Sequence, residues 1–409
     1  MQAFCIVGLP PSDLTTYRMI LTQCPVCAAP LPPTSAKQCS RCKTRYCGPE
    51  CQKHHWEAGG HDKLCKLIRN GGGAEQYHAD KKYSEAVTVA AEACAEDTKG
   101  QTCYICTQAL HWKTKEGLVR GCACRGTAGF AHVSCLAEQA KILWAEAEEN
   151  NLDWKVKCER WRRWDTCSLC EQQHHGVVYC ALGWACWKTY LGRPEVDSAR
   201  RSAMTELGNG LAKARHHEEA LSVREAHLST ERRLGASEED ILAAQCNLAR
   251  AHAALGRLEE SRLMRRDVYS GFLKLGGEES IETITAASNY AATLIKLNRF
   301  EEARSLLRKS IPVARRVLGE SDRLTLEMRW CYATALYQDE GASLDDRREA
   351  VATLESVAHS WKRIFGPAHP ETPKVQGALK YAREALAASQ AVREYLEYLA
   401  PPARHRRDA

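Results

Sequence analysis

The spacing of the cysteines constrains this chain more than any other feature of its sequence. Its 409 residues include 21 cysteines, most of them before residue 171, and many stand in pairs separated by two residues. Disulfide-bonded secreted domains are usually short and follow a signal peptide. The first 20 residues lack the basic start and the apolar stretch of such a peptide. We therefore expect a protein that is not secreted, in the cytoplasm or the nucleus, whose thiols bind metal ions instead of forming disulfides.

A first cluster contains eight residues of metal-ligand type. Two Cys-x-x-Cys pairs are followed by two pairs spaced by four, and the members are Cys24, Cys27, Cys39, Cys42, Cys47, Cys51, His61 and Cys65. A two-residue gap lets a tight turn present two thiolates to one zinc ion, and a spacing of four places both ligands on one side of a helical turn. Four such ligands complete a tetrahedral zinc site, so eight predict two ions.

This order of ligands resembles the MYND finger, as do Tyr46 and the run from Cys51 to Trp56. The resemblance covers residues 24–65 and implies interleaved sets: Cys24, Cys27, Cys47 and Cys51 for one zinc, Cys39, Cys42, His61 and Cys65 for the other. It also implies that the finger binds short proline-containing peptides, with Gln52 and Trp56 at contact positions. The alternatives are that Trp56 is a core anchor and that the finger only folds a segment too short to build a core.

A second cluster has the order four Cys, one His, three Cys, and its members are Cys103, Cys106, Cys122, Cys124, His132, Cys135, Cys167 and Cys170. The PHD finger shares this order, but it usually has a wider third pair and an aromatic residue where this chain has Asp165. One residue separates Cys122 from Cys124, and the run from Gly121 to Leu136 resembles the RING-CH finger. This second resemblance covers residues 100–171.

The RING-CH resemblance implies a cross-brace, with Cys103, Cys106, His132 and Cys135 on one zinc and Cys122, Cys124, Cys167 and Cys170 on the other. The two modules would then bind four zinc ions, two in each. The resemblance further implies a ubiquitin-conjugating enzyme as partner, with Ile105 and Leu136 as apolar contacts and no catalytic residue in the finger itself. Many active members of the family carry Trp four positions after the sixth ligand, where this chain has Gln139.

From about residue 199 the composition shifts to Ala, Leu, Glu and Arg, and a period of 41 to 42 residues appears. It is marked by the acidic pairs Glu218–Glu219, Glu259–Glu260 and Glu301–Glu302. A single helical hairpin cannot bury its apolar face, whereas stacked hairpins can. The sequence therefore predicts a mainly α protein, with two small cross-braced zinc modules followed by an α-solenoid of helical hairpins.

The period, the turn before each acidic pair and the run from Gly366 to Thr372 resemble the tetratricopeptide repeats of kinesin light chain. We expect about four repeats and a capping helix over residues 199–396, with the fourth repeat stretched by a loop at residues 341–346. Such arrays bind peptides or proteins. Asn247 and Asn289 recur where that family points an Asn into the groove; a solvated or helix-capping Asn is the alternative.

Three segments connect or follow these modules. We expect a linker helix at residues 74–98, an aromatic-rich connecting helix at residues 172–196 and a flexible basic tail at residues 397–409. The net charge of +6 is too diffuse to indicate nucleic acid as a partner, and no run of 18 apolar residues indicates a membrane span.

Two functional interpretations remain open. In the first, the chain is an adaptor-type ubiquitin ligase, in which the second finger recruits a charged ubiquitin-conjugating enzyme while the repeats and the first finger select partner proteins. In the second, it is a non-enzymatic, zinc-dependent scaffold for protein–protein interaction. Ile105 and the run from Cys124 to His132 favour the ligase, whereas Gln139 favours the scaffold.

Overall fold

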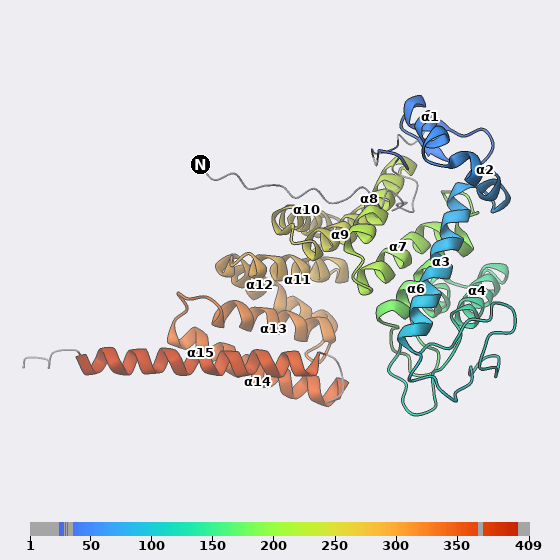
Figure 1. The fold of residues 1–409 in the computed structure, drawn as a ribbon. Helices are drawn as coiled ribbons and strands as arrows, with labels where there is room; N and C mark the ends of the chain where they lie inside the picture. The colour runs from blue at the N-terminus through green and yellow to red at the C-terminus, as the bar shows by residue number, and fades with distance from the viewer. Residues whose placement is uncertain (1–23, 28, 30, 32–35, 367–370, 400–409) are drawn as a thin grey trace, which may run out of the picture. The chain divides into compact units, whose positions relative to one another are not determined.

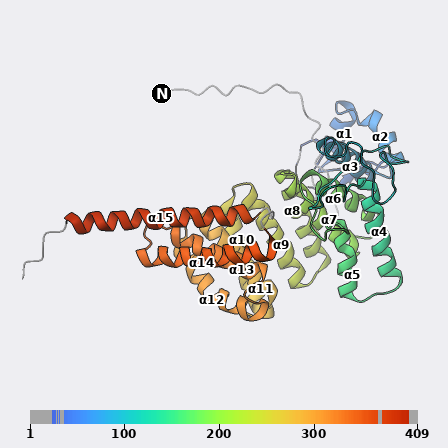
Figure 2. The same ribbon diagram turned by 90° about the horizontal axis from the view of Figure 1, so that it is seen from below.

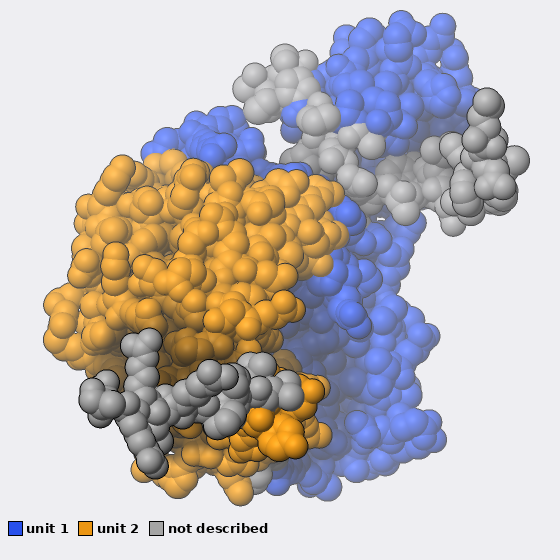
Figure 3. Space-filling model, turned by 90° about the vertical axis from the view of Figure 1, so that its left-hand side faces the viewer, with its two compact units in different colours: residues 1–235 blue, residues 236–409 orange. Residues whose placement is uncertain are grey.

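The computed structural model describes residues 24–27, 29, 31, 36–366 and 371–399. These residues are mainly helical (Figure 1), which confirms the predicted fold class. Contacts between Cα atoms divide the chain into two compact units, residues 1–235 and 236–409, which Figure 3 shows in different colours. We describe each unit by itself.

Some of the segments discussed above lie outside the described residues. These are the N-terminal 20 residues, most of the run from Gly366 to Thr372, and residues 400–409 of the expected tail. The first three residues of that expected tail instead end a long helix, α15 (Thr372–Leu399). Among the described helices, none combines the length and the hydropathy that a bilayer span requires.

The first finger is a short hairpin followed by two helices. Its elements are β1 (Lys37–Gln38), β2 (Arg45–Tyr46), α1 (Pro49–Glu57) and α2 (His61–Asn70), with the two strands paired antiparallel. Gly60 lies between the helices with φ of 70°, a conformation that glycine adopts without steric strain. The ring of Tyr46 is fully buried, and its hydroxyl oxygen lies 3.0 Å from Nδ1 of His55. This buried pair holds α1 against the hairpin.

The rest of unit 1 is a helical body in which the second finger is embedded. Its elements are α3 (Ala74–Ala93), α4 (Val133–Glu149), α5 (Trp154–Trp161), the 3-10 turn η1 (Arg162–Trp164), α6 (Gly176–Tyr190), α7 (Ser198–Lys213) and α8 (His217–Leu234). Helix α6 packs against α3, α4 and α7, and α5 lies beside α4 (Figure 2). The connecting helix is therefore the centre of this body.

An aromatic core joins the second finger to the first helical hairpin, α7–α8. Trp144 of α4 meets Trp161 of α5 edge to face, with ring centroids 4.8 Å apart, and Trp161 lies 5.3 Å from the ring of Tyr190 on α6. Each such aromatic pair stabilises the fold by about 0.5–1.5 kcal/mol beyond the burial of its apolar area. Helices α6 and α7 touch closely at Gly210, where an added Cβ would lie only 2.7 Å from the carbonyl oxygen of Tyr179. Contact of this kind places the first hairpin in unit 1.

Unit 2 continues with three helical hairpins and a final helix. Its elements are α9 (Glu238–Ala254), α10 (Leu258–Gly276), α11 (Ile281–Lys296), α12 (Phe300–Leu318), α13 (Arg323–Tyr337), α14 (Leu344–Phe365) and α15. Each helix packs against the next, and α15 packs against both α13 and α14. Trp361 of α14 is fully buried together with Leu326 and Val375, so α15 covers the apolar end of the stack.

The repeated sequence features have local structural reasons. Each acidic pair occupies the first turn of a second helix, at α8, α10 and α12, where negative charge is favoured by the helix dipole. The residue three positions before each pair has a positive φ, and these residues are Arg215, Gly256 and Asn298. The period thus marks a left-handed turn followed by a helix start.

The expected loop at residues 341–346 is shorter than predicted. Ser343 caps α14: its hydroxyl oxygen accepts a hydrogen bond from the backbone N–H of Asp346, and the carboxylate of Asp346 accepts one from the N–H of Ser343 at 3.0 Å. This reciprocal capping box starts the helix at Leu344, so the second half of the expected loop is helical.

Candidate metal centres

The side chains of all sixteen predicted ligands come together in four groups. Within each group the sulfur and nitrogen atoms lie within 4.8 Å of one another. The groups are Cys24, Cys27, Cys47 and Cys51; Cys39, Cys42, His61 and Cys65; Cys103, Cys106, His132 and Cys135; and Cys122, Cys124, Cys167 and Cys170. These are the sets that the two resemblances imply, although the ligand roles themselves stay predictions.

The spacing of these atoms fits zinc. A tetrahedral ion with Zn–S bonds of about 2.3 Å holds its ligand atoms roughly 3.8 Å apart. The Sγ atoms of Cys39 and Cys65 lie 3.8 Å apart, as do those of Cys124 and Cys167. All the described cysteines are free thiols. Three of the groups are largely buried, so their thiols lie in the setting that a closed structural site provides.

A common backbone turn presents the first ligand of each Cys-x-x-Cys pair. The N–H of the first cysteine donates to the carbonyl oxygen five residues later, at Cys24, Cys39, Cys103 and Cys167, with distances of 2.8–3.0 Å. In the second finger, the N–H groups of Ile105 and Cys106 point at Sγ of Cys103, at 3.4 and 3.5 Å. Such N–H donors stabilise negative charge on the sulfur, which is the form that binds a metal.

The two histidines face their groups through different ring nitrogens. Nε2 of His61 lies 3.4 Å from Sγ of Cys42, whereas Nδ1 of His132 lies 3.4 Å from Sγ of Cys106. Nε2 of His132 is 3.3 Å from the carbonyl oxygen of Ala109, so a proton there can be donated and the lone pair of Nδ1 is left for a metal. Burial lowers the pKa of both imidazoles, which favours the neutral, metal-binding form.

The thiols of the all-cysteine group in the second finger lie close enough to perturb one another's pKa. A hydrogen bond with Cys167 raises the pKa of Cys122, and the same contact lowers the pKa of Cys167 to about 4. The pKa values of neighbouring thiols diverge in this way because several like charges cannot form so close together without a counter-ion. A divalent ion removes the conflict, since it binds every member as thiolate.

The predicted partner-binding residues of the first finger lie at its surface. Trp56 is 42% exposed and its ring lies 5.8 Å from that of His61, so it is not a core anchor. Gln52, one turn earlier on α1, is partly exposed. A peptide could therefore reach both side chains from solvent.

In the repeats, the two asparagines lie within the first helices of neighbouring hairpins. Oδ1 of Asn247 accepts a hydrogen bond from Arg250 at 3.2 Å, and Nδ2 of Asn289 lies 3.8 Å from Sγ of Cys246. The residues that cap these helices are Ser237 and Ser280, so neither asparagine is a helix cap. Both asparagines are partly buried.

An apolar hollow of about 400 Å³ lies beside the Cys103 group. Ile105 lines it and is 37% exposed, whereas Leu136 is buried in the core of the finger and is 6% exposed. Trp112 and Ile142, which the sequence analysis did not single out, also line the hollow and are 68% and 48% exposed. Their signal in the sequence is weak, because neither belongs to a ligand motif or to a repeat.

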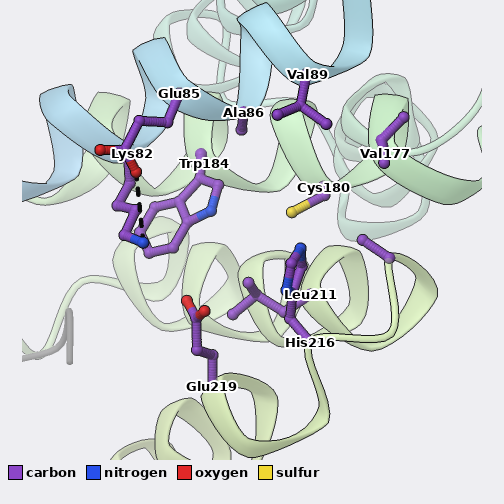
Figure 4. A pocket seen from close by; sticks show the side chains of 11 residues that line it. Lys82, Glu85, Ala86, Val89, Val177, Cys180, Trp184, Leu211, His216 and Glu219 are labelled. Carbon is purple, nitrogen blue, oxygen red and sulfur yellow. Dashed lines mark ion pairs between the residues drawn. The ribbon is translucent and has the colours of Figure 1, made fainter. Parts of the chain in front are cut away.

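A second hollow, of about 140 Å³, lies among α3, α6, α7 and the start of α8 (Figure 4). Its floor is apolar, and Lys82 and Glu85 form an ion pair of 3.4 Å at its edge. The thiol of Cys180 lies in its wall, where burial raises its pKa to about 12. This thiol therefore stays protonated and belongs to the core.

Comparisons with known proteins agree with part of this description. Residues 24–65 match the family model of the MYND finger, and residues 283–323 match that of the tetratricopeptide repeat. No curated protein matches the chain.

Among solved structures, the chain is similar to the putative kinesin light chain TPR-like repeats of Podosopora anserina, with 25% identity over 48% of this chain and 92% of that one and a TM-score of 0.40. A variant of those repeats is 23% identical over 49% and 92%, also with a TM-score of 0.40. BtubC (BKLC) from P. vanneervenii is 13% identical over 68% and 94%, with a TM-score of 0.35. The family models confirm the MYND finger and the tetratricopeptide repeats, and the RING-CH resemblance of the second finger stays a prediction.

Proposed function

We propose that this chain is a zinc-dependent adaptor-type ubiquitin ligase. The MYND finger, the cysteine and histidine groups and the tetratricopeptide repeats support the coarser statement that it is a zinc-binding adaptor for protein–protein interaction. The finer statement is that the second finger, which we propose to be a RING-CH module over residues 100–171, recruits a ubiquitin-conjugating enzyme. Four zinc ions, one in each group, would hold the two fingers in shape.

The observation that carries the ligase proposal is the exposed apolar hollow beside one of the proposed zinc sites. Ile105 stands between two ligands of that site, and the backbone turn around Cys103 holds its side chain at the surface. An exposed apolar surface on a rigid, metal-braced turn is suited to binding another protein. The finger would contribute by positioning the charged enzyme for attack by a substrate lysine, without forming a covalent bond to ubiquitin.

Zinc in this proposal braces the loops and does not activate water, because four protein ligands fill every position of each site. The sixteen ligands of the four groups thus have a structural role. Their effect on activity would come through the shape of the surface that carries Ile105.

Partner selection is assigned to the two remaining modules. We propose that the MYND finger, residues 24–65, binds a peptide through Gln52 and Trp56. We also propose that the repeat array, residues 199–396, binds an extended peptide past Asn247 and Asn289. The partial exposure of these four side chains supports both proposals.

The test is ubiquitin transfer by the full-length protein. Purified chain is incubated with activating enzyme, ubiquitin, ATP and each member of a panel of ubiquitin-conjugating enzymes, and the ubiquitinated products are measured. Ile105→Ala should lower the rate about tenfold or more, because truncating a central apolar contact costs about 1–2 kcal/mol. Leu263→Ala is the matched control, since Leu263 is an aliphatic side chain of similar exposure in unit 2.

The scaffold interpretation makes the opposite prediction. It is favoured by Gln139, which lines the hollow where many active RING-CH fingers have Trp. If the wild-type chain transfers ubiquitin with no enzyme of a broad panel while it still binds zinc and partner proteins, the ligase proposal is wrong and the adaptor is non-enzymatic.

A further inference from the structure

The second finger contains another copy of the ligand-presenting turn, but one without cysteines. It begins at His111, whose N–H donates to the carbonyl oxygen of Glu116 at 3.1 Å, and the N–H of Lys115 donates back to the carbonyl oxygen of His111 at 2.9 Å. Lys115 has φ of 59°, as Thr107 has 61° at the same place in the turn that begins at Cys103. The backbone of a zinc knuckle is therefore repeated eight residues after the first one.

A hydrogen bond closes this turn in place of a metal. His111 and Thr114 occupy the two positions that Cys103 and Cys106 hold in the preceding turn. Nδ1 of His111 lies 2.8 Å from the hydroxyl oxygen of Thr114 and accepts from the backbone N–H of Thr114 at 3.2 Å. The ring of His111 is buried and packs edge to face on His132, with centroids 5.3 Å apart. The turn is thus anchored to the proposed zinc site, while its second residue remains exposed at the surface.

That second residue is Trp112, the largest exposed side chain at the hollow. It is 68% exposed and lines the hollow together with Ile105 and Gln139. When a partner covers a large aromatic side chain that a rigid turn holds in water, the burial of that side chain favours binding. Glu138, the charged residue in the lining, forms an ion pair with Lys141 at 3.3 Å. The complementary surface is therefore apolar and without strong net charge.

We propose that Trp112 is the aromatic docking residue of this hollow. It comes from the metal-free turn, whereas α4 contributes Gln139 at the position where an aromatic was expected. This inference rests on the proposed function, because the partner that covers the hollow is the ubiquitin-conjugating enzyme. Trp112 acts by binding that enzyme and touches no reacting atom. The position of the aromatic differs from the one expected on α4, so the set of enzymes accepted by this finger depends on the turn from His111 to Thr114.

The experiment compares full-length variants with the conjugating enzyme that the wild-type chain uses best. Affinity is measured by isothermal titration calorimetry and transfer by product formation. Trp112→Ala should weaken binding about tenfold or more and lower transfer in parallel, because a buried aromatic anchor contributes strongly to an interface. Trp154→Ala is the matched control: Trp154 lies at the start of α5, is also 68% exposed and does not line the hollow. It should behave like wild type.

A second variant separates docking from folding. In the double variant Trp112→Ala, Gln139→Trp, an aromatic returns to the same hollow from α4, and binding should recover by several-fold over Trp112→Ala alone. A variant that merely misfolds would not recover in this way. Zinc content and the thermal midpoint should stay near wild type throughout.

The outcomes distinguish the two proposals. If the wild-type chain binds and transfers but Trp112→Ala matches Trp154→Ala, the docking role of Trp112 is overturned and the ligase stands. If Trp112→Ala lowers the zinc content or the thermal midpoint together with binding, and Gln139→Trp does not rescue it, a structural role replaces the docking role. If the wild-type chain neither binds nor transfers with any enzyme of the panel, the proposed function fails, and the inference fails with it.

Discussion

The two fingers of unit 1 use the same kind of ligand groups but are stabilised differently. Apart from its ligands, the buried apolar cluster of the first finger consists of Leu31, Tyr46, Ile68 and Ala74. The second finger adds to its groups a core of Val119, Phe130 and Leu182, and the tryptophans that follow continue into α6 and α7. We therefore expect the first finger to depend mainly on metal, and the second to depend on metal and on the helical body together. A module too small for a core can fold on metal ligation alone, whereas a larger module is stabilised by metal ligation and by apolar burial together.

Removal of zinc should produce the largest difference in stability between the two fingers. Metal analysis of the purified chain should give four zinc ions per chain, and a strong chelator should unfold residues 36–70, since ligation of structural zinc contributes about 10–16 kcal/mol in small fingers. Helices α4 and α6 should keep most of their protection, because their apolar cores remain. Hydrogen–deuterium exchange read peptide by peptide measures both. Equal loss of protection in α6 and in the first finger would contradict the comparison.

A smaller effect is expected from truncating one buried aromatic in each finger. Trp164→Ala should destabilise the second finger together with the α7–α8 hairpin by about 3–5 kcal/mol, because Trp164 is 1% exposed in the core that joins them. Tyr46→Ala should weaken zinc binding by the first finger and leave the main unfolding transition near wild type. Chemical denaturation followed by circular dichroism, with zinc release recorded in parallel, compares the two variants.

The smallest effect concerns the pH dependence of the aromatic core. Glu206 of α7 accepts hydrogen bonds from Tyr179 at 2.8 Å and from Nε1 of Trp161 at 3.3 Å. Burial raises its pKa from 4.5 to about 7. Between about pH 4.5 and 7 the folded state keeps this proton while the unfolded state has lost it. The free energy of unfolding should therefore fall as the pH rises through this range, by at most about 3 kcal/mol.

Glu206→Gln removes the titrating group, so its unfolding free energy should depend less on pH than that of the wild type over the same range. Both proteins carry the same zinc ligands, and the loss of zinc in acid therefore cancels in the comparison. Denaturant unfolding at intervals from about pH 4.5 to 7 gives the two slopes. Parallel slopes would show that Glu206 is ionised in the folded state, against the buried position described above.

The fold could be predicted largely from local patterns. Residues that form a hairpin turn, such as Gly256 and Asn298, lie next to the acidic pairs that begin the following helix, so both signals occur within one stretch of sequence. The ligand groups could also be proposed from spacing, because each pair is presented by a turn of a few residues. The spacing does not show which distant turns bind the same ion. That pairing was implied only by the two family resemblances.

Other features could not be predicted, and they depend on contacts between distant residues. The loop at residues 341–346 is a local exception: it is shorter than expected because Ser343 and Asp346, which are close in sequence, form a capping box that starts α14 at Leu344. Leu136 follows a ligand directly, but the way α4 packs buries it. Trp112 and Ile142 become neighbours at one hollow only when the turn at His111 packs against α4.

The mainly helical fold, the repeat period and the chemistry of the ligand residues can all be predicted from the amino-acid sequence, because each depends on residues close together along the chain. Three features depend on the folded structure: the first helical hairpin packs with the second finger, Glu206 is buried and accepts a hydrogen bond from Trp161, and Trp112 lines the same hollow as Ile105. The physical reason is that burial and shape arise from the packing of several helices at once, which no single stretch of sequence specifies.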